Sequence, residues 1–144
     1  MEPRILHLPA ALKDSIIAAA TRAYPFECCG LLVGHAERGI WQVAEIYESD
    51  NLAENRERRF EIDPALQFRL LRTLRVTARN VLGCFHSHPD GAPVPSATDL
   101  EGALEDGFIW LVLGGNPDKG FAIGAFVFDA GEKRFERVTI EGDA

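Results

Sequence analysis

The chain passes from a predicted strand into a predicted helix within the segment His86-Ser-His-Pro-Asp-Gly-Ala-Pro-Val-Pro-Ser-Ala-Thr-Asp99. The run Val81–His86 before it has the length of a strand, and the prolines that follow interrupt regular structure. His86 and His88 are two residues apart, so an extended backbone directs both imidazoles to the same face of a sheet. A helix that begins near Ser96 would then bring Asp99 over the two rings.

These three side chains form a predicted metal site. Two imidazoles and a carboxylate suit zinc and leave its fourth tetrahedral position for water, as in catalytic rather than structural sites. The same set also fits iron or manganese. Taken alone, Ser96 and Asp99 match a helix capping box, and His-x-His is common in surface loops. The metal site is therefore predicted only from these residues in combination. Asp90 is an alternative ligand, although the Pro-Asp-Gly turn gives it a local role.

Two helices are predicted upstream of this segment. Apolar residues at three- and four-residue steps predict an amphipathic helix from Pro9 to Tyr24, which Pro25 ends. The pair Asp63-Pro64 offers an N-cap and a first-turn proline, so a second helix is expected from there to near Asn80. Its inner side is predicted to carry four leucines, namely Leu66, Leu70, Leu71 and Leu74.

Short apolar runs bounded by turn residues predict strands on both sides of these helices. Helices separate the earlier strands, whereas the last three follow one another with only turns between them. This order indicates an α/β fold with a mixed central β-sheet flanked by helices, and 144 residues with 47% hydrophobic content predict a single domain over residues 1–144. The expected strands are Cys28–Gly34, Ile40–Tyr47, Arg59–Asp63, Val81–His86, Phe108–Leu113, Phe121–Phe128 and Phe135–Ile140.

Composition narrows the partners that we expect. A net charge of −7 and a pI near 5.1 disfavour a phosphate-binding surface, so no nucleic acid partner is predicted. No apolar run approaches the roughly 18 to 20 residues that a bilayer requires, and no secretory signal pattern is present, so we expect no membrane contact and a cytoplasmic location. Arg56, Arg58 and Arg59 form a basic cluster that is either a solvated loop or a contact surface for an acidic partner.

The cysteines are predicted to be reduced thiols. Their number, three, is odd, and the adjacent Cys28 and Cys29 are poorly placed to bridge each other. No Cys-x-x-Cys pair occurs, so a thiolate zinc cluster has no support. Cys84 is interpreted as a buried, inert thiol.

With Glu27 included, these motifs resemble the signature of the JAMM (MPN-plus) zinc metallopeptidases. That signature is a glutamate near the start of a strand, then His-Ser/Thr-His, seven residues, a serine, two residues and an aspartate. Here Glu27 lies in Pro-Phe-Glu-Cys-Cys-Gly-Leu-Leu-Val-Gly, before a predicted strand. His86 and His88 flank a serine, and Ser96 and Asp99 follow at the family's spacing. The order of helices and strands extends the resemblance over most of the chain.

The resemblance implies the small prokaryotic single-domain type, with the MPN (cytidine-deaminase-like) architecture. It implies that His86, His88 and Asp99 bind Zn²⁺, that Glu27 is the general base, and that Ser96 helps hold the oxyanion. A carboxylate within reach of a metal-activated water can take its proton and pass it to the leaving amine. The implied enzyme is a zinc metallopeptidase, specifically an isopeptidase similar to deubiquitinases.

The implied substrate is an amide bond at the C-terminal Gly-Gly end of a small ubiquitin-like or sulfur-carrier protein. Segments 48–58 and 100–107 are too short for the insertions through which larger relatives bind ubiquitin, and an extended tail is expected to add as a strand beside the site. The alternatives are a non-catalytic MPN scaffold or a zinc hydrolase of small amides. Against the latter, the deaminase pattern His-x-Glu with Pro-Cys-x-x-Cys is missing, and His-x-His amidohydrolases need a barrel of about 200 residues or more.

Overall fold

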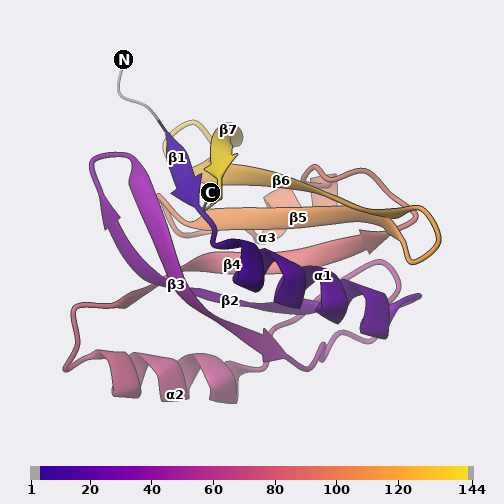
Figure 1. Cartoon of the computed structure of the whole chain (residues 1–144), viewed down its shortest axis with the longest axis horizontal. Helices are drawn as coiled ribbons and strands as arrows, with labels where there is room; N and C mark the ends of the chain where they lie inside the picture. Colours follow the sequence, from indigo (N-terminus) through magenta and orange to yellow (C-terminus); the bar gives the residue numbers. More distant parts are fainter. Residues whose placement is uncertain (1–3, 143–144) are drawn as a thin grey trace.

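A computed structural model describes residues 4–142, which form a strongly curved β-sheet with helices packed against it (Figure 1). The mixed α/β class expected from the sequence is confirmed. The elements in chain order are β1 (Ile5–His7), α1 (Ala10–Ala23), β2 (Cys29–Glu37), β3 (Ile40–Ser49), α2 (Pro64–Leu74), β4 (Asn80–Pro89), α3 (Ala97–Gly102), β5 (Ile109–Asn116), β6 (Gly120–Asp129) and β7 (Arg134–Glu141).

The strands close into a barrel in the order β1-β3-β2-β4-β5-β6-β7. The short strand β1 closes it, because it pairs parallel with β3 on one side and with β7 on the other. β4 and β5 also pair parallel, and the remaining neighbours are antiparallel. The expected central sheet flanked by helices is therefore wrong, because the sheet closes on itself as a barrel. Three residues are too few to show an alternating pattern, so β1 was not predicted, yet it joins the two edges of the sheet.

Alternation along the strands divides the buried side chains into two apolar clusters. Leu32 and Phe85 belong to the cluster that also takes the inner side of α1. Their neighbours Leu31 and Cys84 belong to the second cluster, which takes the inner side of α2. Because side chains at the end of β4 continue this alternation, the two faces of the sheet differ in which functional residues they carry.

Helix α2 begins as predicted but ends early. The carboxylate of Asp63 accepts a hydrogen bond of 2.9 Å from a first-turn N–H. The helix ends at Leu74 rather than near Asn80, because both the N–H and the hydroxyl of Thr77 donate to the Leu74 carbonyl. Three of the four predicted leucines are buried, but Leu71 is 59% exposed, so its assignment to the inner side is wrong.

The predicted strand Arg59–Asp63 is also wrong, because the segment makes only an isolated bridge between Ile62 and Asn51. The Asn51 side chain takes up the backbone groups that a strand partner would use. Its amide donates to the carbonyl of Arg59 over 2.9 Å, and its Oδ1 accepts from the N–H of Glu61 over 3.0 Å. The chain from residue 50 to 63 therefore stays irregular.

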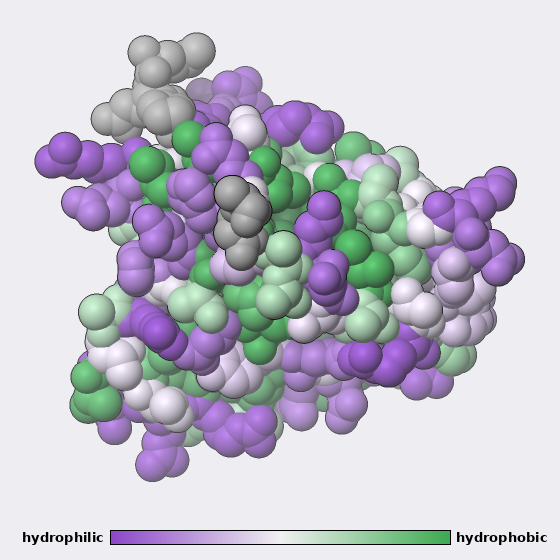
Figure 2. Space-filling model, viewed as in Figure 1, coloured by the Kyte–Doolittle hydropathy of each residue, from purple (hydrophilic) through white to green (hydrophobic). Residues whose placement is uncertain are grey.

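The face of the molecule in Figure 2 carries both hydrophilic and hydrophobic side chains. Hydrophilic side chains lie along the margins of the face in Figure 2, with hydrophobic ones between them. Within residues 4–142, no helix combines the length and the apolar character needed to cross a membrane.

Cys28, Cys29 and Cys84 are free and buried, and burial raises the pKa of Cys28 to about 11 and that of Cys29 to about 12.

Candidate metal centre

Pairing between β2 and β4 brings the two sequence motifs side by side. The antiparallel register runs past the first residue of β2, because the N–H of Ser87 donates to the Cys28 carbonyl over 3.2 Å. The N–H of Cys28 donates in return to Ser87 Oγ over 2.8 Å. Glu27 is therefore placed opposite His88. The buried serine between the two histidines thus has a structural role that its motif position did not reveal.

His86, His88 and Asp99 converge on one point. Nε2 of His86 lies 3.0 Å from Nε2 of His88 and 3.0 Å from Asp99 Oδ2. Nε2 of His88 lies 3.2 Å from the same carboxylate oxygen. His86 is fully buried, and the side chains of Asp99 and His88 are 6% and 15% exposed. The structure thus brings together the three side chains that the sequence analysis proposed as ligands.

The tautomer of His88 leaves an acceptor atom at this point. Nδ1 of His88 lies 3.1 Å from the carbonyl of Ala92, and a carbonyl only accepts, so Nδ1 carries the proton. In neutral His88, Nε2 is then a lone pair directed at His86 and Asp99. Two ring nitrogens and a carboxylate oxygen about 3 Å apart favour a shared cation, and this donor set is one that zinc uses.

The pKa values of the three converging side chains also indicate a site that favours positive charge. Burial lowers the pKa of His86, and the hydrogen bond to Asp99 only partly opposes it. Burial also acts to lower the pKa of His88, but Asp99 and the Ala92 carbonyl outweigh it and raise the pKa. Burial acts to raise the pKa of Asp99, but its contacts with His86, His88 and the N–H of Ser96 outweigh burial and hold that pKa far below its usual range. The site is therefore built around an ionised carboxylate.

A capping box positions Asp99. Its N–H donates to Ser96 Oγ over 3.0 Å, and the N–H of Ser96 donates to Asp99 Oδ2 over 2.8 Å, which confirms the capping interpretation. The carboxylate oxygen that meets the histidines is thus held by a backbone hydrogen bond, as metal-binding carboxylates commonly are. The hydroxyl proton of Ser96 is not used in this box and remains available as a donor.

Glu27 lies beside the three converging side chains. Its carboxylate and the rings of His86 and His88 offer atoms that all lie within 4.8 Å of one another. Asp99 is nevertheless the closer carboxylate, at 3.0 and 3.2 Å from the two ring nitrogens. Glu27 is 4% exposed, and its Oε1 has no hydrogen-bond partner among the described residues. Burial raises the pKa of Glu27 to about 8, so this carboxyl can exchange a proton near neutral pH.

Two aromatic residues that the sequence analysis did not single out hold the ring of His86. Phe60 stacks on it with ring centroids 4.2 Å apart, and Trp110 meets it edge-on at 5.8 Å. Trp110 lies in an apolar run and Phe60 in an irregular segment, so neither carries a local signal for this contact. Only the tertiary fold brings them to the histidine.

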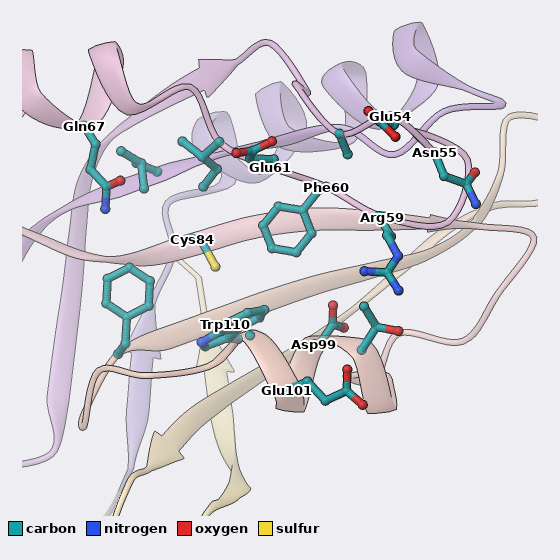
Figure 3. A pocket seen from close by; sticks show the side chains of 16 residues that line it. Glu54, Asn55, Arg59, Phe60, Glu61, Gln67, Cys84, Asp99, Glu101 and Trp110 are labelled. Atoms are coloured by element: carbon teal, nitrogen blue, oxygen red, sulfur yellow. The ribbon is translucent and has the colours of Figure 1, made fainter.

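A groove of about 860 Å³ opens beside Asp99 (Figure 3). One wall is the irregular segment 53–62, the other is α3, and Trp110 lies between them. Arg59 extends from the first wall toward Asp99. Its neighbour Arg56 lies instead over the ring of Phe26, with the guanidinium 4.4 Å from the ring centroid. The basic cluster therefore divides between the groove and a local packing contact.

Comparison with known sequences identifies the family of the chain. A family model described as prokaryotic homologs of the JAB domain matches residues 9–128. The chain is 32% identical over 117 residues to a desampylase of Haloferax volcanii, covering 78% of this chain and 81% of that protein. It is 34% identical over 87 residues to a desampylase of Pyrococcus furiosus, with 60% and 59% covered. It is 31% identical over 102 residues to the histone deubiquitinase MYSM1 of Branchiostoma floridae, covering 69% of this chain but only 12% of that protein.

Solved structures show the same fold. A protein of Desulfitobacterium hafniense, DSY2949, superposes with a TM-score of 0.81 at 25% identity, covering 96% of this chain and 92% of that one. A protein of Salinibacter ruber superposes with a TM-score of 0.68 at 30% identity, covering 95% and 90%. The relatives named desampylase and deubiquitinase are JAMM-type isopeptidases, which are hydrolases. The chain belongs to the prokaryotic homologs of the JAB domain, and the resemblance drawn from its motifs is confirmed.

Proposed function

We propose that this single-domain chain is a zinc-dependent peptidase that cleaves an amide bond at the C-terminal Gly-Gly end of a small ubiquitin-like or sulfur-carrier protein. The observation that carries the proposal is the convergence of His86, His88 and Asp99 on one point, with the buried Glu27 beside them. The names of the relatives, desampylase and deubiquitinase, support a ubiquitin-like substrate.

In this proposal His86, His88 and Asp99 hold Zn²⁺. Their two imidazole nitrogens and one carboxylate oxygen leave one of the four usual zinc positions open for water. When bound, zinc lowers the pKa of that water toward about 7 and polarises the scissile carbonyl. The backbone hydrogen bond from Ser96 to Asp99 and the Ala92 carbonyl on His88 keep the donor atoms oriented.

Glu27 takes the proton of the attacking water and later gives it to the leaving amine. Its position beside the two rings supports this role, because a base must lie within reach of the water whose proton it takes. The hydroxyl of Ser96 donates to the carbonyl oxygen as negative charge develops there. Removing such a donor typically costs about 3 kcal/mol of transition-state stabilisation.

The substrate tail is proposed to lie in the groove rather than beside a strand edge. β4 pairs with β2 up to His86 on one side and with β5 up to Pro89 on the other, so little free edge remains on this strand. The groove between segment 53–62 and α3 leads to Asp99 instead (Figure 3). Glycines at the end of the tail suit this approach, because they place no side chain between the groove walls and the scissile bond.

The test is to incubate the zinc-loaded protein with a ubiquitin-like carrier protein that has a short extension after its Gly-Gly end. Mass spectrometry is expected to show loss of the extension and a product that ends in Gly-Gly. The same carrier with Ala-Ala at this position is the matched control, and small amides are assayed in parallel. Failure to trim any Gly-Gly-ended carrier would contradict the proposed substrate.

A further inference from the structure

The turn that follows β4 is held from two other parts of the chain. Asp90 has a φ of 59°, a left-handed conformation that costs a non-glycine residue about 1 kcal/mol or more. Its N–H donates to the carbonyl of Gly115 over 2.6 Å. Its carboxylate accepts from the hydroxyl of Tyr24 over 2.8 Å and from the side-chain amide of Asn116 over 3.1 Å. These contacts hold the turn in its unusual conformation.

The carboxylate of Asp90 thereby joins elements that are distant in sequence. Tyr24 directly follows α1, and Asn116 is the last residue of β5. Asn116 is itself oriented, because its Oδ1 accepts from the N–H of Lys119 over 2.8 Å. The sequence also offers Asp90 as an alternative metal ligand. Its two oxygens instead each accept a hydrogen bond from outside the converging triad.

The same turn supplies the acceptor that orients His88. The N–H of Gly91 donates to the His88 carbonyl over 3.0 Å, and the carbonyl of Ala92 accepts from His88 Nδ1 over 3.1 Å. A proton fixed on Nδ1 leaves Nε2 as the lone pair that faces Asp99. The position of one backbone carbonyl therefore determines which nitrogen of His88 can bind a metal.

Two glycines allow this turn to pack closely on the sheet. A Cβ at Gly114 would come within 2.4 Å of backbone atoms of Gly91 and Ala92. A Cβ at Gly124 would come within 2.3 Å of the carbonyl oxygen of Pro93. The turn thus packs directly against the backbone of β5 and β6. The hydrogen bonds of Asp90 hold its first residue in place.

We propose that Tyr24, Asp90 and Asn116 form a positioning cluster that fixes the Ala92 carbonyl and so selects the metal-binding tautomer of His88. The inference rests on the proposed function, because it needs His88 as a metal ligand. Asp90 does not touch the reacting atoms, and its effect passes through the turn. Outer partners of metal-binding residues typically change metal affinity by about 10- to 100-fold.

The central variant is Asp90→Gly, which removes the carboxylate while glycine keeps the left-handed backbone without strain. Competition with a zinc chelator of known affinity measures the zinc Kd, which is expected to rise about 10-fold. Asp90→Asn retains a carbonyl acceptor and tolerates the same φ, so it should recover part of the affinity. Tyr24→Phe and Asn116→Ala each remove one donor and should weaken binding by a few fold.

Lys133→Gly is the matched control. Lys133 has a φ of 52° in the turn between β6 and β7, so the substitution makes the same backbone change away from the site. Its zinc Kd should equal that of the parent. Cobalt-substituted protein gives a second readout, because its visible absorption reports ligand geometry. The spectrum should change in Asp90→Gly and stay the same in Lys133→Gly, and thermal unfolding of each variant checks the fold.

A zinc Kd for Asp90→Gly within about 2-fold of the parent would overturn the inference, as would an equal loss in Lys133→Gly. If Asp90→Gly does not fold, Tyr24→Phe and Asn116→Ala carry the same test, and a parent-like Kd in both would overturn it. A parent that binds no zinc would contradict the proposed function and this inference together. Zinc binding by the parent with no effect at Asp90 would contradict this inference alone.

Discussion

The two sides of the site are held by different means. On one side, His86 and His88 are fixed by β4, which has a paired neighbour on each side. Glu27 precedes β2, and its N–H donates to the carbonyl of Arg56 over 2.7 Å. On the other side, the groove wall at residues 53–62 makes a single bridge and depends on the side chain of Asn51. Strand register therefore places the two histidines, whereas a few local hydrogen bonds hold Glu27 and shape the groove wall.

The largest expected effect comes from removing a proposed metal ligand on β4. His88→Ala should weaken zinc binding by more than about 100-fold, since loss of a ligand exceeds the effect of an outer partner. Competition with a chelator measures the change. His35→Ala removes an exposed histidine from β2 and should bind zinc like the parent. Parent-like zinc affinity in His88→Ala would refute the ligand set.

The next effect tests how tightly the strands are packed. A Cβ at Gly30 would come within 2.3 Å of the Phe85 ring and 2.4 Å of the Tyr47 carbonyl. Gly30→Ala should therefore lower the free energy of unfolding by about 2 kcal/mol or more. Urea denaturation measures it, and Gly102→Ala is the control, because nothing lies within 4 Å of a Cβ there. Equal stability of the two variants would show that the strand packing is looser than the structure indicates.

Local sequence patterns predicted the parts of the site that depend on local geometry. The spacing of His86 and His88 gives two rings on one face, and Ser96 with Asp99 gives a capping box, because both relations span only a few residues. The barrel closure by β1 was missed, since pairing with β3 and β7 is long-range. The contact of Phe60 with His86 was missed for the same reason.

The wrong predictions share a physical cause. Segment 59–63 has strand-forming residues, but the Asn51 side chain occupies its backbone groups. Helix α2 has helix-forming residues past Leu74, but Thr77 caps the Leu74 carbonyl. In both cases a single side chain competes with regular backbone pairing. Propensity and periodicity do not register such competition.

A smaller effect is expected on the groove side. Phe60→Leu removes the stack on His86, and aromatic contacts contribute about 1 kcal/mol, so kcat/KM should fall about 5-fold. Zinc content should stay at the parent level because the ligands are unchanged. Phe68→Leu is the control, since Phe68 is 64% exposed on α2. A loss of zinc in Phe60→Leu would mean that the two sides of the site are not separable.

The smallest effect concerns the basic cluster. Arg56→Leu removes the contact with the Phe26 ring and should lower the free energy of unfolding by about 0.5 to 1 kcal/mol. Arg58→Leu, at an exposed neighbouring position, should change it less. Thermal unfolding of both variants compares them. A larger loss in Arg58→Leu would contradict the packing role assigned to Arg56.

The proposed function depends most on Glu27 as the base beside the metal ligands. The direct measurement combines zinc analysis with the C-terminal trimming assay on the parent and on Glu27→Gln. We predict about one zinc per chain in both proteins, as three ligands are retained, and trimming at least about 100-fold slower in Glu27→Gln. Parent-like trimming by a Glu27→Gln protein that retains its zinc would contradict the account.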